Sequence, residues 1–199
     1  MKKKLMMALG LAQGLAAFDV AAADSITLPE PQKEGGIPLM EAINRRRTTR
    51  EFSAKKIDDQ MLSDILYAAW GVSHDGKRTI PTARNLQDMQ VYVIKADGTF
   101  LYDGESNTLN LVSEKDLRPY FNKQDLMADA PLTLLFTGKA PKYAPMHAGS
   151  AYQNVALYTA GCGLNNVVRG MFDKEGIAKE LNIPEEEVLI SQTIGWPYM

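Results

Sequence analysis

The sequence predicts an α+β fold in which a mixed, mainly antiparallel sheet lies between helices in three layers. Three observations support this prediction. Segments with strand periodicity and segments with helical periodicity follow one another without the regular strand–helix–strand order of a doubly wound parallel sheet. Two of the expected strands are joined as a hairpin and are therefore antiparallel. A chain of 199 residues, 45% of them hydrophobic, is large enough to bury one core.

The first half of the fold is expected to begin with two helices. The first starts at Pro38, a residue that suits the first helical turn, and carries the arginines of residues 45–47 in its last turn. The second runs through residues 58–71 and has Asp58 as its cap. A polar loop at residues 74–88 then leads to the first strand.

The second half is expected to alternate strands and helices around one central helix. A hairpin over residues 89–103 turns at Asp97-Gly98. We expect a short helix over residues 114–121, capped by Ser113, and a long central helix over residues 148–163 that is apolar nearly all round. The remaining predicted elements are strands at 131–138, 164–172 and 187–197, and a helix capped by Asp173 that carries Ile177 and Leu181.

The N-terminus has the pattern of a secretory signal peptide. A lysine run precedes an apolar stretch at residues 5–18 that is too short to span a bilayer, and alanines complete a cleavage site. We expect residues 1–23 to be removed, residues 24–37 to form an extended arm and residues 38–199 to form the domain. The protein is then expected to be exported to the periplasm without a stable membrane anchor. A membrane-tethering helix is the alternative.

The composition argues against several classes of function. The formal net charge of −2 and the short basic run do not favour nucleic-acid binding. The single cysteine allows no internal disulfide and no cysteine-based zinc site. The two histidines, His74 and His147, have no second ligand at helical spacing. The sequence contains neither a P-loop nor a G-x-S-x-G motif, so we assign no metal ligand and no catalytic residue.

Residues 45–52, RRRTTREF, place four arginines in six positions. Like charges at this spacing repel one another, so nearby carboxylates or a bound anion should offset them. Glu41, Glu51 and Asp58 could provide the carboxylates around a solvated helix end. A phosphate could bind instead, because guanidinium groups form paired hydrogen bonds with it. The arginine segment alone leaves both interpretations open.

Three further segments could complete a site for a phosphorylated ring compound. Residues 78–87, RTIPTARNLQ, form a polar loop in which Asn85 offers both a donor and an acceptor. The alternative for Asn85 is a turn residue bonded to its own backbone. Residues 161–164, GCGL, end a helix with glycines that let the backbone approach a flat ring, whereas the Cys162 side chain is best interpreted as small and buried. The third segment is GWP at residues 195–197.

In this order and spacing, the segments resemble the nitroreductase family of flavin proteins from Ile37 to Pro197. Arg46 to Phe52 is similar to the RRSxRxF motif of that family, Pro81 to Gln87 to its PSxxNxQP loop, and Gly149 to Leu164 to its late helix. The pattern is nearest to the subgroup often called SagB-type, after a peptide-azoline oxidase. One departure is Asp88, which stands where a proline is common.

The resemblance implies a nitroreductase-like fold and an FMN-dependent oxidoreductase acting on a small planar substrate such as a quinone or nitroaromatic. It also implies a homodimer with FMN in the subunit interface, where the flavin carries the redox chemistry. The alternatives are an exported flavin-binding protein without turnover and a SagB-like peptide dehydrogenase. The electron donor, NAD(P)H or a quinol, stays open. The cofactor-binding positions carried over from the family are Arg46, Arg47, Thr48, Arg50, Pro81, Thr82, Ala83, Asn85, Gly161, Cys162, Gly163 and Leu164.

Overall fold

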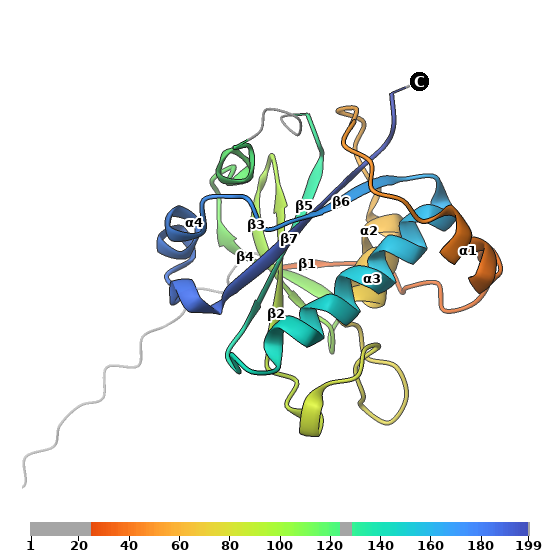
Figure 1. Ribbon diagram of the computed structural model, residues 1–199, viewed down its shortest axis with the longest axis horizontal. Helices are drawn as coiled ribbons and strands as arrows, with labels where there is room; N and C mark the ends of the chain where they lie inside the picture. Colours follow the sequence, from red (N-terminus) through yellow and green to blue (C-terminus); the bar gives the residue numbers. More distant parts are fainter. Residues whose placement is uncertain (1–24, 124–128, 199) are drawn as a thin grey trace, which may run out of the picture.

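The computed structural model describes residues 25–123 and 129–198, so the predicted signal peptide lies outside the described residues. Within them, one seven-stranded sheet has the order β1-β4-β3-β2-β5-β7-β6, and every neighbouring pair is antiparallel (Figure 1). The mainly antiparallel sheet is therefore confirmed. The strands are β1 Ser25–Thr27, β2 Met89–Lys95, β3 Gly98–Asp103, β4 Thr108–Ser113, β5 Leu132–Gly138, β6 Asn165–Arg169 and β7 Val188–Gly195.

Helices cover both faces of the sheet, as predicted. On one face lie α1 (Leu39–Arg45), α2 (Asp59–Trp70) and α3 (Ala144–Cys162), and on the other lies α4 (Lys174–Leu181) (Figure 1). Short 3₁₀ turns complete the fold, namely η1 Ala83–Asn85, η2 Arg118–Phe121 and η3 Glu185–Glu187. No helix in the described part of the chain is long and apolar enough to cross a membrane.

Strand β5, in the interior of the sheet, lies between two hydrophobic cores. All of its residues are buried. Leu134 and Phe136 belong to the core beneath α2 and α3, whereas Leu135, between them, belongs to the core beneath α4. This alternation follows from the period of two in a strand, which sends neighbouring side chains to opposite faces. A continuous apolar run such as PLTLLFTG therefore fits a strand covered on both sides.

The caps of two predicted helices are confirmed. The Asp58 side chain accepts a hydrogen bond from the Met61 amide at 2.8 Å, and that of Asp173 accepts one from the Gly176 amide at 3.1 Å. Each carboxylate satisfies an amide that has no partner within its own helix. These short local signals therefore locate the starts of α2 and α4 correctly.

Three element predictions are wrong. The first helix ends at Arg45, because Arg46 already has an extended ψ of 123°, so Arg46 and Arg47 follow the helix rather than form its last turn. The expected helix over 114–121 is only the 3₁₀ turn η2, and Ser113 ends a strand instead of capping it. That strand, β4, was not predicted. It pairs with β3 on one side and with β1 on the other.

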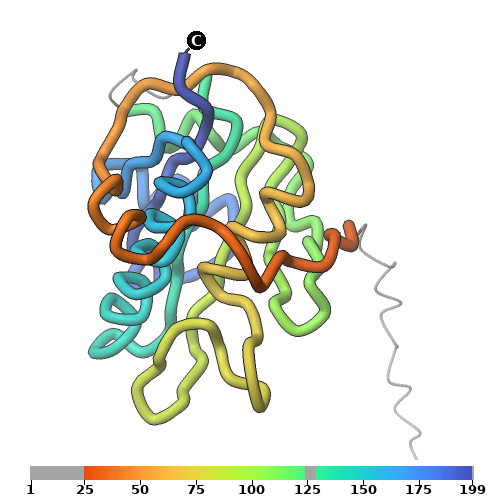
Figure 2. The backbone as a smooth tube through the Cα atoms, turned by 90° about the vertical axis from the view of Figure 1, so that its right-hand side faces the viewer, coloured from red at the N-terminus to blue at the C-terminus, as the bar shows by residue number. Residues whose placement is uncertain are grey.

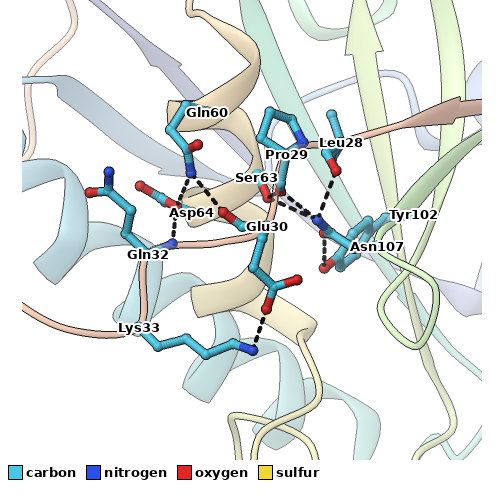
Figure 3. A network of polar contacts seen from close by, with 10 residues as sticks. All are labelled: Leu28, Pro29, Glu30, Gln32, Lys33, Gln60, Ser63, Asp64, Tyr102 and Asn107. Carbon is cyan, nitrogen blue, oxygen red and sulfur yellow. Dashed lines mark hydrogen bonds and ion pairs between the residues drawn. The ribbon is translucent and has the colours of Figure 1, made fainter.

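The predicted extended arm is bound along the body of its own chain. Its first residues form β1, and Leu28 is buried. The carbonyl of Pro29 accepts hydrogen bonds from Ser63 Oγ at 2.5 Å and from Asn107 Nδ2 at 2.8 Å (Figure 3). Figure 2 shows the arm crossing from the sheet edge towards α1. The arm therefore fixes where α1 and the arginine segment begin.

Candidate functional site

A cleft of about 480 Å³ lies where α1 ends and α3 passes into β6. Its lining contains no aspartate or glutamate. A larger open cleft of about 660 Å³ lies near the start of α3, but Glu185 and Glu186 line it and would repel an anion. The cleft at the end of α1, called the arginine cleft below, is lined by Asn44, Arg45, Arg46, Arg47, Thr49, Ala160, Gly163, Leu164, Asn165, Asn166 and Pro197.

Only one of the four clustered arginines has a carboxylate partner among the described residues. Arg45 forms an ion pair with Glu41 one helical turn earlier. No ion pair joins Arg46, Arg47 or Arg50 to a carboxylate in the described part of the chain. Burial, and after it the nearby charge of Arg50, lowers the pKa of Arg169. The repulsion expected from the sequence thus persists in the folded chain, which favours a bound anion over a carboxylate-neutralised helix end.

Thr49 fixes the arginine segment to the sheet. Its amide donates to the Asn166 carbonyl at 3.0 Å, and its Oγ1 accepts from the Asn166 amide at 3.0 Å. Asn166 is itself held from behind, because its side chain donates to Thr159 at 2.9 Å and accepts from Gln192 at 3.2 Å. Thr48 and Arg50, the neighbours of Thr49, are exposed. A buried polar network therefore presents these two side chains to solvent.

The glycine-containing end of α3 contributes backbone to the arginine cleft. Gly163 ends the helix with a φ of +74°, in the left-handed region that favours glycine. Gly161 lies against Ile37, where an added Cβ would stand 3.4 Å from that side chain. Burial raises the pKa of the half-buried Cys162 thiol, so it is a poor nucleophile. This agrees with a small, partly buried side chain without a chemical role.

The loop around Asn85 has a strained backbone. Arg84, Asn85 and Gln87 have φ values of +54°, +55° and +45°. Side chains other than glycine rarely adopt this region, and each instance costs about 1–3 kcal/mol unless the surroundings impose it. Such strain is concentrated at functional sites. Its presence in the predicted loop supports a role beyond that of an ordinary turn.

A second cleft, of about 420 Å³, lies beside this loop. Gln87 connects the loop to its surroundings, because its Oε1 accepts from Arg78 Nε at 2.9 Å and its Nε2 donates to Asn85 Oδ1 at 3.2 Å. The Asn85 side chain is thus bonded to a neighbour two residues away. The lining residues of this second cleft are Ser73, His74, Lys77, Arg78, Thr79, Ile80, Pro81, Thr82 and Asn85.

Helix α3 separates the two clefts. The loop with Asn85 lies at the start of α3, where Ala83 contacts His147, and the arginine cleft lies at the end of that helix. From His147 to Gly163 the helix spans about 24 Å, at about 1.5 Å per residue. One chain therefore does not bring all predicted cofactor-binding residues together.

The predicted site residues fall into three groups. Arg46, Arg47, Gly163 and Leu164 line the arginine cleft, and Pro81, Thr82 and Asn85 line the second cleft. Sequence reasoning missed Thr49 and Asn166, which hold the arginine segment in place. The hydroxyl of Thr49 within the arginine run was a signal, whereas its partner 117 positions later could not be identified. The residues that line neither cleft are Thr48, Arg50, Ala83, Gly161 and Cys162.

Comparisons with known proteins agree on one family. The profile of the Nitroreductase family matches residues 43–196. A Methanocaldococcus jannaschii protein, provisionally named a nitroreductase, is 27% identical over 187 residues, covering 83% of this chain and 93% of its own. A crystal structure of a protein from Ralstonia eutropha, also provisionally named a nitroreductase, is 34% identical, with a TM-score of 0.83, covering 90% of this chain and 92% of its own.

A second structure comes from Desulfovibrio desulfuricans and contains FMN. It is 19% identical with a TM-score of 0.59, and the match covers 83% of this chain and 89% of that one, which shows a shared fold. The profile match spans most of the chain, from the end of α1 to the turn after β7, and includes every lining residue of both clefts except Pro197. The chain therefore belongs to the nitroreductase family, a family of oxidoreductases.

Proposed function

We propose that this protein binds FMN and uses it to reduce or oxidise a small planar substrate such as a quinone or nitroaromatic. The observation that carries the proposal is the arginine cleft, whose lining contains no acid and in which Arg46 and Arg47 have no carboxylate partner among the residues that the structure describes. A dianionic phosphate would offset this charge with charge-assisted hydrogen bonds. Membership of the nitroreductase family and an FMN-containing structural relative support FMN as the phosphorylated ligand.

The residues present fit such a ligand. Arg46, Arg47 and Arg50 would hold the phosphate, and the exposed Thr48 hydroxyl would donate to it or to the neighbouring sugar-alcohol chain. The backbone of residues 161–164 would lie near the ring system. Bound FMN supplies electron and hydride transfer, and the protein supplies placement and hydrogen bonds. Neither histidine lies in the arginine segment or at the end of α3, and we assign no protein acid or base to the reaction.

A homodimer would complete the site. The loop with Asn85 and the arginine cleft lie at opposite ends of α3, so one chain cannot present both to the same flavin. Large apolar side chains are exposed near each end, with Met40 72% exposed on α1 and Met146 67% exposed at the start of α3. A second copy that joins the arginine cleft of one chain to the Asn85 loop of the other would bury both surfaces.

The location and the donor follow from the predicted signal peptide. An exported protein would receive electrons from a quinol or a membrane reductase, because nicotinamide nucleotides are scarce outside the cytoplasm. Anaerobic bleaching of the flavin with NADH, NADPH and a quinol in turn would identify the donor. Rapid, saturable bleaching by a nicotinamide at micromolar concentration would contradict this part of the proposal.

The proposed function is tested by the cofactor itself. The purified protein should be yellow, and boiling should release FMN. Arg46→Ala, which removes an arginine that lines the arginine cleft, should weaken FMN binding by roughly 10- to 150-fold, the equivalent of one hydrogen bond to a charged group at about 1.5–3 kcal/mol. Riboflavin binding should change less than twofold, because riboflavin has no phosphate. Glu51→Ala, which changes an exposed neighbour in the same segment, should not weaken FMN binding.

Turnover distinguishes an enzyme from a flavin carrier. After reduction with dithionite, an added quinone or nitroaromatic should restore the yellow colour in a substrate-dependent, saturable reaction. A protein that releases no FMN and cannot be reconstituted would overturn the proposal. Colour that returns no faster with substrate than without it would favour the flavin-binding protein without turnover.

A further inference from the structure

A buried histidine at the start of α3 accepts a hydrogen bond from the backbone of the strained loop. His147, in the first turns of α3, is only 3% exposed. Its Nε2 lies 2.8 Å from the Ala83 amide nitrogen, and its Nδ1 lies 3.1 Å from Asp88 Oδ1. The second carboxylate oxygen of Asp88 accepts a hydrogen bond from the Ala140 amide at 2.8 Å. These contacts form one continuous chain from the β5–α3 connection to the loop.

The partners determine which ring nitrogen carries the proton. A backbone amide can only donate, so Nε2 of His147 must be its acceptor and carries no hydrogen. The hydrogen of the neutral ring is then on Nδ1, where it is donated to the carboxylate of Asp88. Asp88 is thus the residue that selects this tautomer, as carboxylates commonly do for functional histidines.

The amide held by this pair occupies a sensitive position. Ala83 begins the turn η1, and the first amide of a helical turn has no acceptor within the turn. Of the four residues that follow Ala83, three have positive φ, namely Arg84, Asn85 and Gln87. A strained segment persists only when its surroundings impose the conformation, so its starting point has to be fixed. The other side-chain contacts that hold the loop in the described part of the chain are those of Gln87 with Arg78, Asn85 and Thr82.

We propose that Asp88 and His147 are positioning residues that hold the loop 82–87, with its Asn85, in its strained conformation through the Nδ1–H tautomer of His147. The consequence for FMN rests on the proposed function, whereas the tautomer and the loop geometry do not. Asp88 stands where the family motif commonly has proline. At this position the chain has a carboxylate that bridges Ala140 and His147 and so orients the ring.

Asp88→Asn is the most informative variant. An amide cannot accept at both of its terminal atoms, so it cannot serve the Ala140 amide and His147 Nδ1–H together. With its oxygen on Ala140, its NH₂ group faces Nδ1 and drives the ring hydrogen to Nε2, against the Ala83 amide. The shape of the site is nearly unchanged, so the fold should persist. His147→Gln provides the conservative comparison, because its terminal oxygen can still accept from Ala83.

The test uses NMR on the purified full chain. ¹⁵N spectra should show wild-type His147 protonated at Nδ1 only, and hydrogen exchange should show a protected Ala83 amide. Asp88→Asn should move the proton to Nε2 and speed Ala83 exchange at least tenfold, whereas His147→Gln should retain most of the protection. His74→Ala, which changes the other histidine, should leave the Ala83 amide unchanged. Far-UV circular dichroism verifies that each variant is folded.

Two results would overturn the proposal. One is an Nε2–H tautomer in the wild-type protein, and the other is Ala83 exchange that is equal in the wild type and Asp88→Asn. Under the proposed function, Asp88→Asn should also raise the dissociation constant for FMN. A wild-type protein that binds no FMN but shows the expected spectra would refute the proposed function and leave this inference standing.

Discussion

Replacing Asp64 should destabilise the protein more than any other single change in the arm region. Its carboxylate is 6% exposed and accepts hydrogen bonds from the Gln32 amide at 2.8 Å, Gln60 Nε2 at 3.1 Å and the Tyr158 hydroxyl at 3.0 Å (Figure 3 shows the first two). The three donors come from the arm, from α2 and from α3. Burial, above all, raises the pKa of Tyr158, so this hydroxyl stays a donor well above neutral pH.

The magnitude follows from these contacts. Each hydrogen bond to a charged acceptor contributes about 1.5–3 kcal/mol, and a buried donor left without a partner costs about 1–3 kcal/mol. The alanine variant no longer has to bury a charged carboxylate, and this gain offsets part of the loss. Asp64→Ala should therefore lower the free energy of unfolding by about 3 kcal/mol. Asp64→Asn keeps one acceptor oxygen and can donate to the Tyr158 hydroxyl, so its loss should be about 1 kcal/mol.

Urea unfolding followed by circular dichroism measures both effects. For a chain of this size, about 3 kcal/mol corresponds to a fall in Tm of roughly 6–12 °C. Gln60→Ala, which removes the longest of the three contacts together with the hydrogen bond from Gln60 to the Glu30 carbonyl, is the comparison variant and should cost about 1.5 kcal/mol, the low end of the range for one bond to a charged acceptor. The reasoning is refuted if Asp64→Ala costs less than about 1 kcal/mol, or if Asp64→Asn costs as much as Asp64→Ala.

Three further predictions concern the arginine cleft and the assembly. Thr49→Val should cost about 1–2 kcal/mol in urea unfolding, because the buried Asn166 amide loses its acceptor, whereas Thr48→Val at an exposed position should cost under about 0.5 kcal/mol. Cys162 should react with iodoacetamide at pH 8 more slowly than a free thiol, because its raised pKa leaves less thiolate. Equal rates would contradict its burial. Sedimentation should show a dimer, and Met40→Glu should shift it towards monomer with loss of FMN; a monomer that retains full FMN would contradict the shared site.

The sequence predicted those elements whose signals are local. Asp58 and Asp173 marked helix starts, and the Asp97-Gly98 turn marked a hairpin that forms as expected between β2 and β3. Strand β4 was missed because its stability comes from pairing with β3 and β1, which only the tertiary fold creates. The end of α1 was misplaced because arginine has good helix propensity, whereas the contact of Thr49 with the sheet draws the chain into an extended path.

The sequence predicted which residue types form the candidate site, but not how their side chains are arranged in space. The four arginines were evident, but the lack of a carboxylate partner for Arg46, Arg47 and Arg50 among the described residues depends on where Glu51 and Asp58 point after folding. The positive φ values of the loop could not be foreseen either, because RTIPTARNLQ contains no glycine to signal them. The same holds for His147, whose partners lie about 60 positions away in the chain and give no pattern at helical spacing.

Two features that lower the stability of the fold lie at opposite ends of helix α3. Uncompensated arginine charge lies beyond the end of α3, and three residues with positive φ lie at its beginning. The arginine charge has no carboxylate partner at Arg46, Arg47 or Arg50 within the described residues, and the loop keeps its positive φ values although His147 and Gln87 hold it in place. A bound anion would offset the charge of the arginines. A ligand that binds to the loop would account for its strained conformation. Under the proposed function, a ligand shared between two chains would provide both at once, because a second copy in the opposite orientation would join the end of one α3 to the beginning of the other. Dimerisation and cofactor binding should then be thermodynamically linked, so that added FMN lowers the dissociation constant of the dimer by the same factor by which dimerisation tightens FMN.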